Sequence, residues 1–264
     1  MAVTEQVERL PEPGIVRGFD RRDFLDVPFD MADLDAVLSA LRGRTAEDRF
    51  AYVVTPNVDH VVRLSRHADL LPAYRAAFMS WCDSHPIWAF ARLTGLPMPH
   101  LNGTDVVVQI FDKVLRPGDR LVCITADEAL IDELTARFPQ YDFVGYSPPM
   151  GFEDNPAEMD RCVRFIRDNP GRFVFLGVGS PRSERLAHAV QQAGGATGTA
   201  FCIGAALEFI VGRKARAPRA MRTLGLEWLH RLASEPGRLW RRYVLAIPPL
   251  CVLFTRELLS RRNA

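Results

Sequence analysis

Short apolar runs alternate with longer amphipathic stretches over the first two hundred residues of the chain. Apolar runs of four to seven residues, rich in Val, Ile and Phe, are typical of strands buried on both faces. Such runs lie at residues 49–55, 79–83, 120–125, 142–145, 172–177 and 199–203. Helical spacing predicts helices at residues 58–65, 70–78, 87–94, 128–138, 156–168, 181–192 and 205–211. Residues 101–115 begin with turn residues and continue as a helix that Thr104 is predicted to cap. The alternation predicts an α/β fold, a mostly parallel sheet with helices on both faces.

Polar residues cluster where these strands are predicted to end. In open α/β sheets, ligands bind at the carboxyl ends of the strands. Thr55 and Asn57 follow one strand and Asp83 follows another. A carboxylate at that place predicts a general base for a hydroxyl, and a helix cap is the structural alternative. For Thr55 and Asn57 two interpretations are open: they form the turn after the strand, or they contact the substrate.

The segment Gly177–Glu184 (GVGSPRSE) follows a strand and opens a helix. Glycines let a ligand approach the backbone, and a helix N-terminus offers unpaired N–H groups to a diphosphate. Ser180 is a predicted cap and Pro181 a predicted first helical residue. The pattern differs from the two common nucleotide-binding glycine motifs, and a plain tight turn explains it equally well. Gly204 to Glu208 form a similar cluster after the last strand.

Composition describes an ordinary globular chain. The 264 residues include 33 Lys and Arg against 32 Asp and Glu, and 48% are hydrophobic. These values exclude a disordered chain and a coiled coil. No run reaches the roughly 18 to 20 apolar residues of a membrane-spanning helix, and the first residues lack a signal-peptide pattern, which favours a cytoplasmic protein.

Cysteine and histidine spacings indicate no metal site. The five cysteines include no CxxC pair, so buried reduced thiols are expected. No HExxH pair occurs among the six histidines. The only D-x-D, Asp33 to Asp35, falls in an amphipathic helix pattern, where a solvated face is expected.

The near-zero net charge conceals an asymmetry between the two ends of the chain. Residues 213–264 hold 12 basic and 3 acidic residues, which leaves 21 basic and 29 acidic for residues 1–212. We therefore predict a body over 1–212 and a basic, amphipathic helical appendage over 213–264, bound to an anionic partner. In the appendage Trp, Tyr and Leu alternate with Arg, which favours a peripheral position on an anionic membrane surface. Pro248-Pro249 are expected to break its apolar run.

The apolar residues of the appendage also allow a packing role. They could pack on the body or on a second subunit, which would make a homo-oligomer. Nucleic acid is disfavoured as the anionic partner, because no nucleic-acid-binding motif is present.

Six segments together resemble the WecG/TagA/CpsF family of glycosyltransferases, also called glycosyltransferase family 26. The resemblance covers residues 24–250, nearly the whole chain. The matching segments are TPN (55–57), CDSHPIWAFARLTGLPMPHLNGTD (82–105), GYSPPMGF (145–152), FLGVGSPRSE (175–184), CIGAALEFIVGRKARAP (202–218) and LGLEWLHRLASEPGRLWRRY (224–243).

The resemblance implies a Rossmann-like body and an inverting, metal-independent hexosyltransferase. Such enzymes move a sugar from a UDP-sugar to a polyprenyl-diphosphate-linked saccharide in surface polysaccharide biosynthesis, at the inner face of the plasma membrane. UDP-sugar is the donor substrate, and no cofactor is implied. The appendage is implied to aid membrane binding and to bring arginines to the active site.

Site residues follow by position. The resemblance makes Asp83 the catalytic base, with Thr55 and Asn57 beside it. The predicted acceptor-side residues are His100, Asn102 and Asp105. The predicted donor and diphosphate contacts are Gly177, Gly179, Pro181, Ser183, Glu184, Gly204, Glu208, Arg231, Arg238 and Arg241.

Several positions depart from the family pattern. Ser84 replaces a Gly, His100-Leu101 an Arg-Val pair, Arg182-Ser183 a Lys-Gln pair, Ala126-Asp127 a Gly-Gly turn, and Ala205-Ala206 part of a Gly-rich turn. These changes leave the donor open among the UDP-sugars of glucose, N-acetylmannosamine and its uronic acid. A catalytically degraded membrane adaptor is one alternative. A nucleotide-dependent oxidoreductase is another, although the glycine segment lacks its fingerprint.

Overall fold

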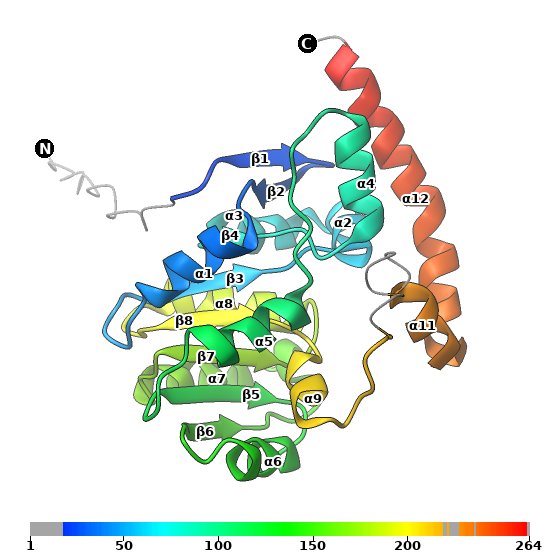
Figure 1. Cartoon of the computed structure of the whole chain (residues 1–264). Helices are drawn as coiled ribbons and strands as arrows, with labels where there is room; N and C mark the ends of the chain where they lie inside the picture. Colours follow the sequence, from blue (N-terminus) through cyan, green and yellow to red (C-terminus); the bar gives the residue numbers. More distant parts are fainter. Residues whose placement is uncertain (1–17, 219–220, 222–226, 235, 263–264) are drawn as a thin grey trace, which may run out of the picture.

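A six-stranded sheet in which every neighbouring pair of strands is parallel forms the centre of the molecule (Figure 1). The computed structural model describes residues 18–218, 221, 227–234 and 236–262. In spatial order the strands are β4 (Met79–Ser80), β3 (Ala51–Val54), β8 (Thr199–Cys202), β7 (Phe173–Gly177), β5 (Arg120–Thr125) and β6 (Asp142–Tyr146). The predicted α/β class, Rossmann-like with helices on both faces, is confirmed.

Both faces of the sheet are buried, which explains the continuous apolar runs. Along β3, Ala51 and Val53 join one hydrophobic cluster, whereas Tyr52 and Val54 join the other. The first cluster includes α1 (Leu34–Arg42), α5 (Gly103–Lys113), α6 (Ala129–Arg137) and α9 (Ala206–Val211). The second includes α2 (Val58–Leu64), η1 (Ala68–Leu70), α3 (Leu71–Ala76), α4 (His85–Leu93), η2 (Phe152–Asp154), α7 (Pro156–Asp168) and α8 (Arg182–Ala193).

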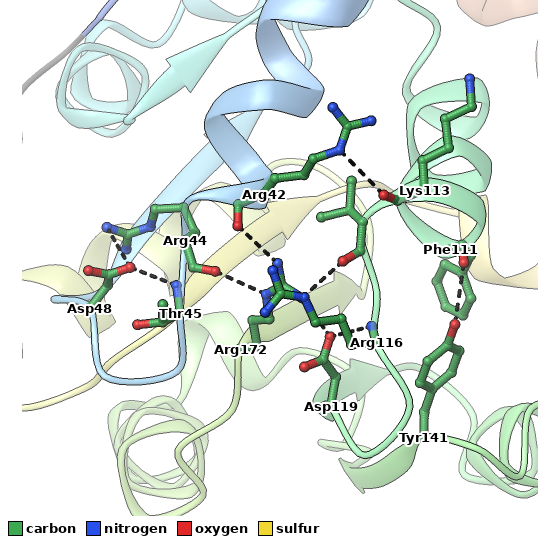
Figure 2. A network of polar contacts seen from close by, with 11 residues as sticks. Arg42, Arg44, Thr45, Asp48, Phe111, Lys113, Arg116, Asp119, Tyr141 and Arg172 are labelled. Carbon is green, nitrogen blue, oxygen red and sulfur yellow. Dashed lines mark hydrogen bonds and ion pairs between the residues drawn. The ribbon is translucent and has the colours of Figure 1, made fainter.

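The amino ends of the strands are tied together by a buried arginine, Arg172 (Figure 2). Its Nη1 pairs with Asp119 at 2.7 Å and donates to the Val114 carbonyl at 2.9 Å. Its Nε donates to the Arg44 carbonyl at 3.0 Å, which fastens the chain after α1. Because these residues precede β5 and β7 or follow α1, the network stabilises the edge of the sheet opposite the predicted site.

An antiparallel hairpin of β1 (Arg21–Phe24) and β2 (Val27–Asp30), absent from the sequence prediction, precedes the sheet. Buried Asp30 accepts two bonds of 2.7 Å from Arg21 and one of 2.7 Å from the Ser80 amide. This carboxylate therefore fastens the hairpin to the edge strand β4.

Two helices form the described part of the appendage: α11 (Glu227–Ser234) and α12 (Pro236–Arg262). The long helix α12 runs beside α4 (Figure 1), and Phe254 stacks on Phe90 with ring centroids 4.1 Å apart. Ala246, Leu250 and Leu253 of α12 are buried against the body. The expected break at Pro248-Pro249 is wrong, because α12 continues through both prolines. Among the described residues, no helix is both long and apolar enough to cross a membrane.

Local details correct several predictions about single residues. Asn102, not Thr104, caps α5, because Asn102 is the extended residue before the helix and its side chain accepts from the Thr104 and Asp105 amides. Pro181 occupies the N-cap of α8 without a side-chain cap bond, so neither Ser180 nor Pro181 has the predicted position. Four cysteines are buried, but Cys251 is exposed on α12.

Candidate functional site

Three segments that are distant in the sequence meet around Gly103 at the carboxyl edge of the sheet. A Cβ atom built on Gly103 would lie 3.5 Å from Asp83 Oδ2 and 3.7 Å from Thr55 Oγ1. The Asp83 amide donates to the Pro56 carbonyl at 3.1 Å, which holds the segment after β4 against the segment after β3. Gly103, the first residue of α5, thus lets the helix N-terminus approach the two polar side chains closely.

Asp83 does not have the helix-capping role that was its structural alternative. Ser84 is the N-cap of α4, and its hydroxyl accepts from the Ile87 amide. The Asp83 carboxylate lies instead on the side of α5, close to Thr55. A carboxylate at a strand end and next to a helix N-terminus is suited to exchange protons with a substrate hydroxyl.

Thr55 and Asn57 have different local tasks. The buried Thr55 hydroxyl donates to the Cys202 carbonyl at 3.3 Å, which joins the ends of β3 and β8. The Asn57 side chain caps α2 by accepting from the Asp59 amide at 3.0 Å and the His60 amide at 3.4 Å. Asn57 therefore performs the turn chemistry that the sequence left as one of two interpretations.

The predicted acceptor-side residues lie together at the start of α5. Asn102 accepts from the Thr104 and Asp105 amides at 3.0 and 3.2 Å. His100 stacks on His85 with ring centroids 5.1 Å apart. A cavity of about 400 Å³ beside them is lined by Leu34, His100, Leu101, Asn102, Asp105, Val106 and Gln109.

The glycine segment after β7 packs against the segment after β8. A Cβ atom on Gly177 would lie 3.4 Å from the Gly204 carbonyl oxygen, and Gly179 has a φ of +82° that favours glycine. The buried Ser183 donates its hydroxyl to the Leu176 carbonyl at 3.0 Å and its amide to the Gly179 carbonyl at 2.9 Å. Both bonds join Ser183 to backbone carbonyls of β7 and of the turn that follows it, so Ser183 stabilises this turn between β7 and α8.

Glu184 lies behind this turn, in a buried polar cluster. One carboxylate oxygen is 3.8 Å from His60 Nδ1, and that nitrogen is 3.1 Å from the Tyr74 hydroxyl. Arg63 donates to the Ser180 hydroxyl at 2.8 Å. Burial raises the pKa of Glu184 to about 7, and the Arg63 charge acts in the opposite direction. Glu184 is only 2% exposed, so in this structure it lies buried beneath the turn between β7 and α8.

Three basic residues that the sequence analysis does not assign to the site form ion pairs with acids near it: Arg213, Lys214 and Arg216. Arg213 binds Glu133 at 2.8 Å and Asp127 at 2.5 Å, and Lys214 pairs with Glu208. Arg216 Nη1 pairs with Asp105 at 2.6 Å. The signal available in the sequence was the basic run RKAR at 213–216, directly after the last predicted helix.

The side chains of Arg231, Arg238 and Arg241 lie outside the part of the chain that the structure describes, so their predicted roles stay predictions. Within the described residues, no group of three or more His, Cys, Asp or Glu residues could hold a metal ion.

Comparison with known proteins gives a consistent set of relatives. Residues 22–264 match the family described as "Glycosyl transferase WecG/TagA/CpsF family". An N-acetylglucosaminyldiphosphoundecaprenol N-acetyl-beta-D-mannosaminyltransferase of Bacillus spizizenii (strain ATCC 23059 / NRRL B-14472 / W23) is 27% identical over 216 residues, covering 76% of this chain and 77% of the relative. A protein with the same name from Bacillus subtilis (strain 168) is 23% identical over 240 residues, covering 89% and 85%.

Proposed function

This chain belongs to the WecG/TagA/CpsF family of glycosyltransferases, and on that premise we propose that it is an inverting, metal-independent hexosyltransferase. It takes a hexose-type sugar from a UDP-sugar and gives it to a polyprenyl-diphosphate-linked saccharide in surface polysaccharide biosynthesis. The names of two relatives, which specify a diphosphoundecaprenol-linked acceptor and mannosaminyl transfer, support this substrate class.

The observation that carries the proposal is the approach of Asp83 and Thr55 to Gly103 at the carboxyl edge of the sheet. In the proposed reaction, Asp83 takes the proton of an acceptor hydroxyl as the oxygen attacks the anomeric carbon. UDP leaves from the opposite face of the sugar, so the anomeric configuration inverts. Thr55, whose hydroxyl donates to the Cys202 carbonyl, lies next to this carboxylate and lines the proposed site.

The departing UDP gains negative charge, which needs compensation. Two features support such a role: helix N-termini at this edge, which favour anions, and the arginines in the helices α11 and α12 of the appendage. Gly177 and Gly179 lie at the turn from β7 to α8, and Gly204 follows β8; the absence of side chains there supports a close approach of the diphosphate to the backbone. Arg231, Arg238 and Arg241 remain proposed contacts of that diphosphate.

We place the reaction at the cytoplasmic face of the membrane that holds the lipid-linked acceptor. Five apolar residues of α12 are each more than half exposed and support a peripheral attachment there: Val244, Leu245, Ile247, Val252 and Leu259.

The test of the base is Asp83→Asn, which keeps the size of the side chain and removes its proton affinity. UDP release is measured with a lipid-linked N-acetylglucosamine acceptor and a panel of UDP-sugars that begins with UDP-N-acetylmannosamine. We expect kcat to fall by about 100-fold or more, the usual contribution of a general base. Asp35→Asn, an exposed change on α1, is the matched control and should keep wild-type turnover. Near-wild-type turnover in Asp83→Asn would exclude this carboxylate as the base.

A further inference from the structure

Only one of the three guanidinium nitrogens of Arg216 has a hydrogen-bond partner among the described residues. Its Nη1 donates to Asp105 at 2.6 Å. Its Nε and Nη2 are shielded from solvent, and neither has a hydrogen-bond partner among the described residues. Charged N–H groups withdrawn from water without a partner are unfavourable, so they mark a place where a ligand group is to be expected.

The two unpaired nitrogens lie on the same edge of the guanidinium. Nε and the neighbouring Nη2 together donate two parallel hydrogen bonds, the geometry with which arginine binds a phosphate or a carboxylate. Asp105 occupies the other end of the group through Nη1. The pairing with Asp105 therefore engages Nη1 alone and leaves the edge formed by Nε and Nη2 without a partner among the described residues.

The surroundings of Arg216 favour an anion of the substrate. Asp105 lies in the first turn of α5, whose first residue, Gly103, faces Asp83 and Thr55. Arg216 is thus paired with Asp105, the third residue of α5, and Gly103, the first residue of the same helix, faces the proposed base. The positive end of the α5 dipole adds to the guanidinium charge at this point.

The basic residues Arg213 and Lys214 of the same segment differ from Arg216. Arg213 donates through Nε, Nη1 and Nη2 to the carboxylates of Glu133 and Asp127. Lys214 is paired with Glu208. All three guanidinium nitrogens of Arg213 are therefore paired with two acids, whereas Arg216 pairs with one acid through Nη1 and its Nε and Nη2 have no partner among the described residues.

We propose that Arg216 binds the diphosphate of the nucleotide donor, and that Asp105 is the residue that positions it. This inference rests on the proposed function and adds a phosphate contact from residues 213–218, ahead of α11. Asp105 is then a positioning residue and not an acceptor contact. Since Nε and Nη2 are covered in the ligand-free chain, the diphosphate reaches them when the side chain turns about its bond to the half-exposed Asp105 carboxylate.

The test is a titration of the full-length chain with UDP by calorimetry, with uridine as a ligand that lacks the diphosphate. We expect Arg216→Ala to weaken UDP binding by about tenfold or more and to leave uridine binding unchanged. Arg216→Lys, which keeps the charge but loses the two-donor edge, should bind UDP with intermediate affinity. Arg213→Ala removes the same charge from the same segment and should bind UDP within about twofold of wild type.

Asp105→Asn tests the positioning role. We expect a smaller loss of UDP affinity than in Arg216→Ala, and no further loss when the two changes are combined, because both act on one contact. The melting temperature without ligand shows whether each variant is folded, and Arg216→Lys and Asp105→Asn decide the question if Arg216→Ala is not.

The outcomes separate the inference from the function on which it rests. A wild-type chain that does not bind UDP would contradict the proposed donor. A wild-type chain that binds UDP, with equal affinity in Arg216→Ala or Arg216→Lys, would overturn the role of Arg216 alone. Equal losses for UDP and uridine would also overturn it, since they would indicate a general disturbance of the site.

Discussion

Asn57 and Asp83 both follow strands of the sheet, yet their side chains perform different local tasks. Asp83 approaches Gly103 at the start of α5, as Thr55 does. Whether a polar side chain caps a helix depends on backbone angles of its neighbours, which one sequence does not reveal. Asn57 therefore proved to be a cap, whereas Asp83 left that task to Ser84.

Glu184 shows how burial changes a single group. Its pKa is raised to about 7 in the folded chain, mainly by burial, against an ordinary 4.5. The folded state holds this proton between about pH 4.5 and 7, whereas the unfolded state releases it. The contribution of Glu184 to the free energy of unfolding must therefore fall as the pH rises through that range, and it stays low above pH 7.

We predict that Glu184→Gln removes this penalty. Between pH 5 and pH 8, the free energy of unfolding of the wild type should fall relative to that of the variant by about 3 kcal/mol, an order-of-magnitude value from the size of the shift. Urea unfolding at the two pH values measures the difference. Titration of the groups that do not contact Glu184 is common to both chains, so parallel pH profiles would contradict a protonated Glu184.

At the scale of elements, the sequence predicted most of the sheet and its helices because they follow simple periodicities. The predicted ranges 120–125 and 156–168 are those of β5 and α7. The β1–β2 hairpin escaped prediction because its strands are short and one carries Arg21, Arg22 and Asp23, so neither has an apolar run. The continuity of α12 through two prolines escaped as well, because packing on the body outweighs local preference.

The start of α5 is the element boundary on which the site depends most. A methyl group on Gly103 would have ordinary contact distances, 3.5 Å to Asp83 Oδ2 and 3.6 Å to Thr55 Cγ2. We predict that Gly103→Ala keeps the free energy of unfolding within about 1 kcal/mol, since alanine favours the helix. The methyl group would fill the space between the two side chains, so kcat should fall by about tenfold or more, the effect of a small misplacement of reacting groups.

Gly43→Ala is the matched control for Gly103→Ala. Its methyl group would lie 3.5 Å from the Ala40 carbonyl oxygen at the end of α1, next to Arg44, whose carbonyl belongs to the Arg172 network at the opposite edge of the sheet. Urea unfolding and UDP release are measured for both variants. If both retain full turnover, the space around Gly103 is not part of the reaction site.

At the scale of the whole molecule, long-range pairing decides features that no local pattern contains. The strand order places β8 between β3 and β7, which brings Thr55 to Cys202. The ion pairs of Arg213 and Arg216 likewise join the start of the appendage to acids far away in the sequence. The charge asymmetry indicated an anionic partner for the appendage, yet its first basic residues pair with the acidic body.

The outer surface of α12 is where the whole molecule is expected to meet the membrane. The inner side of the helix is covered by the body, and Leu245, Val252 and Leu259 are each more than half exposed. A cavity of about 250 Å³ next to Leu245 is also lined by Arg63, Arg66 and His67 and by one acid, Asp59. Apolar side chains beside basic ones fit the boundary between acyl chains and anionic headgroups.

We predict that replacing Leu245, Val252 and Leu259 together by Gln abolishes flotation of the protein with vesicles rich in anionic phospholipid and leaves its melting temperature unchanged. The loss follows from removing exposed apolar area, because no buried contact is changed. Met150→Gln, a change of an almost fully exposed residue in the loop after β6, is the control and should float as the wild type does. Undiminished flotation of the triple variant would exclude this surface as the membrane contact. Light scattering tests the other occupant of this surface. If the triple variant dissociates from an oligomer while flotation is unchanged, a second copy of the chain covers α12. The membrane contact would then lie with the basic groups near α2.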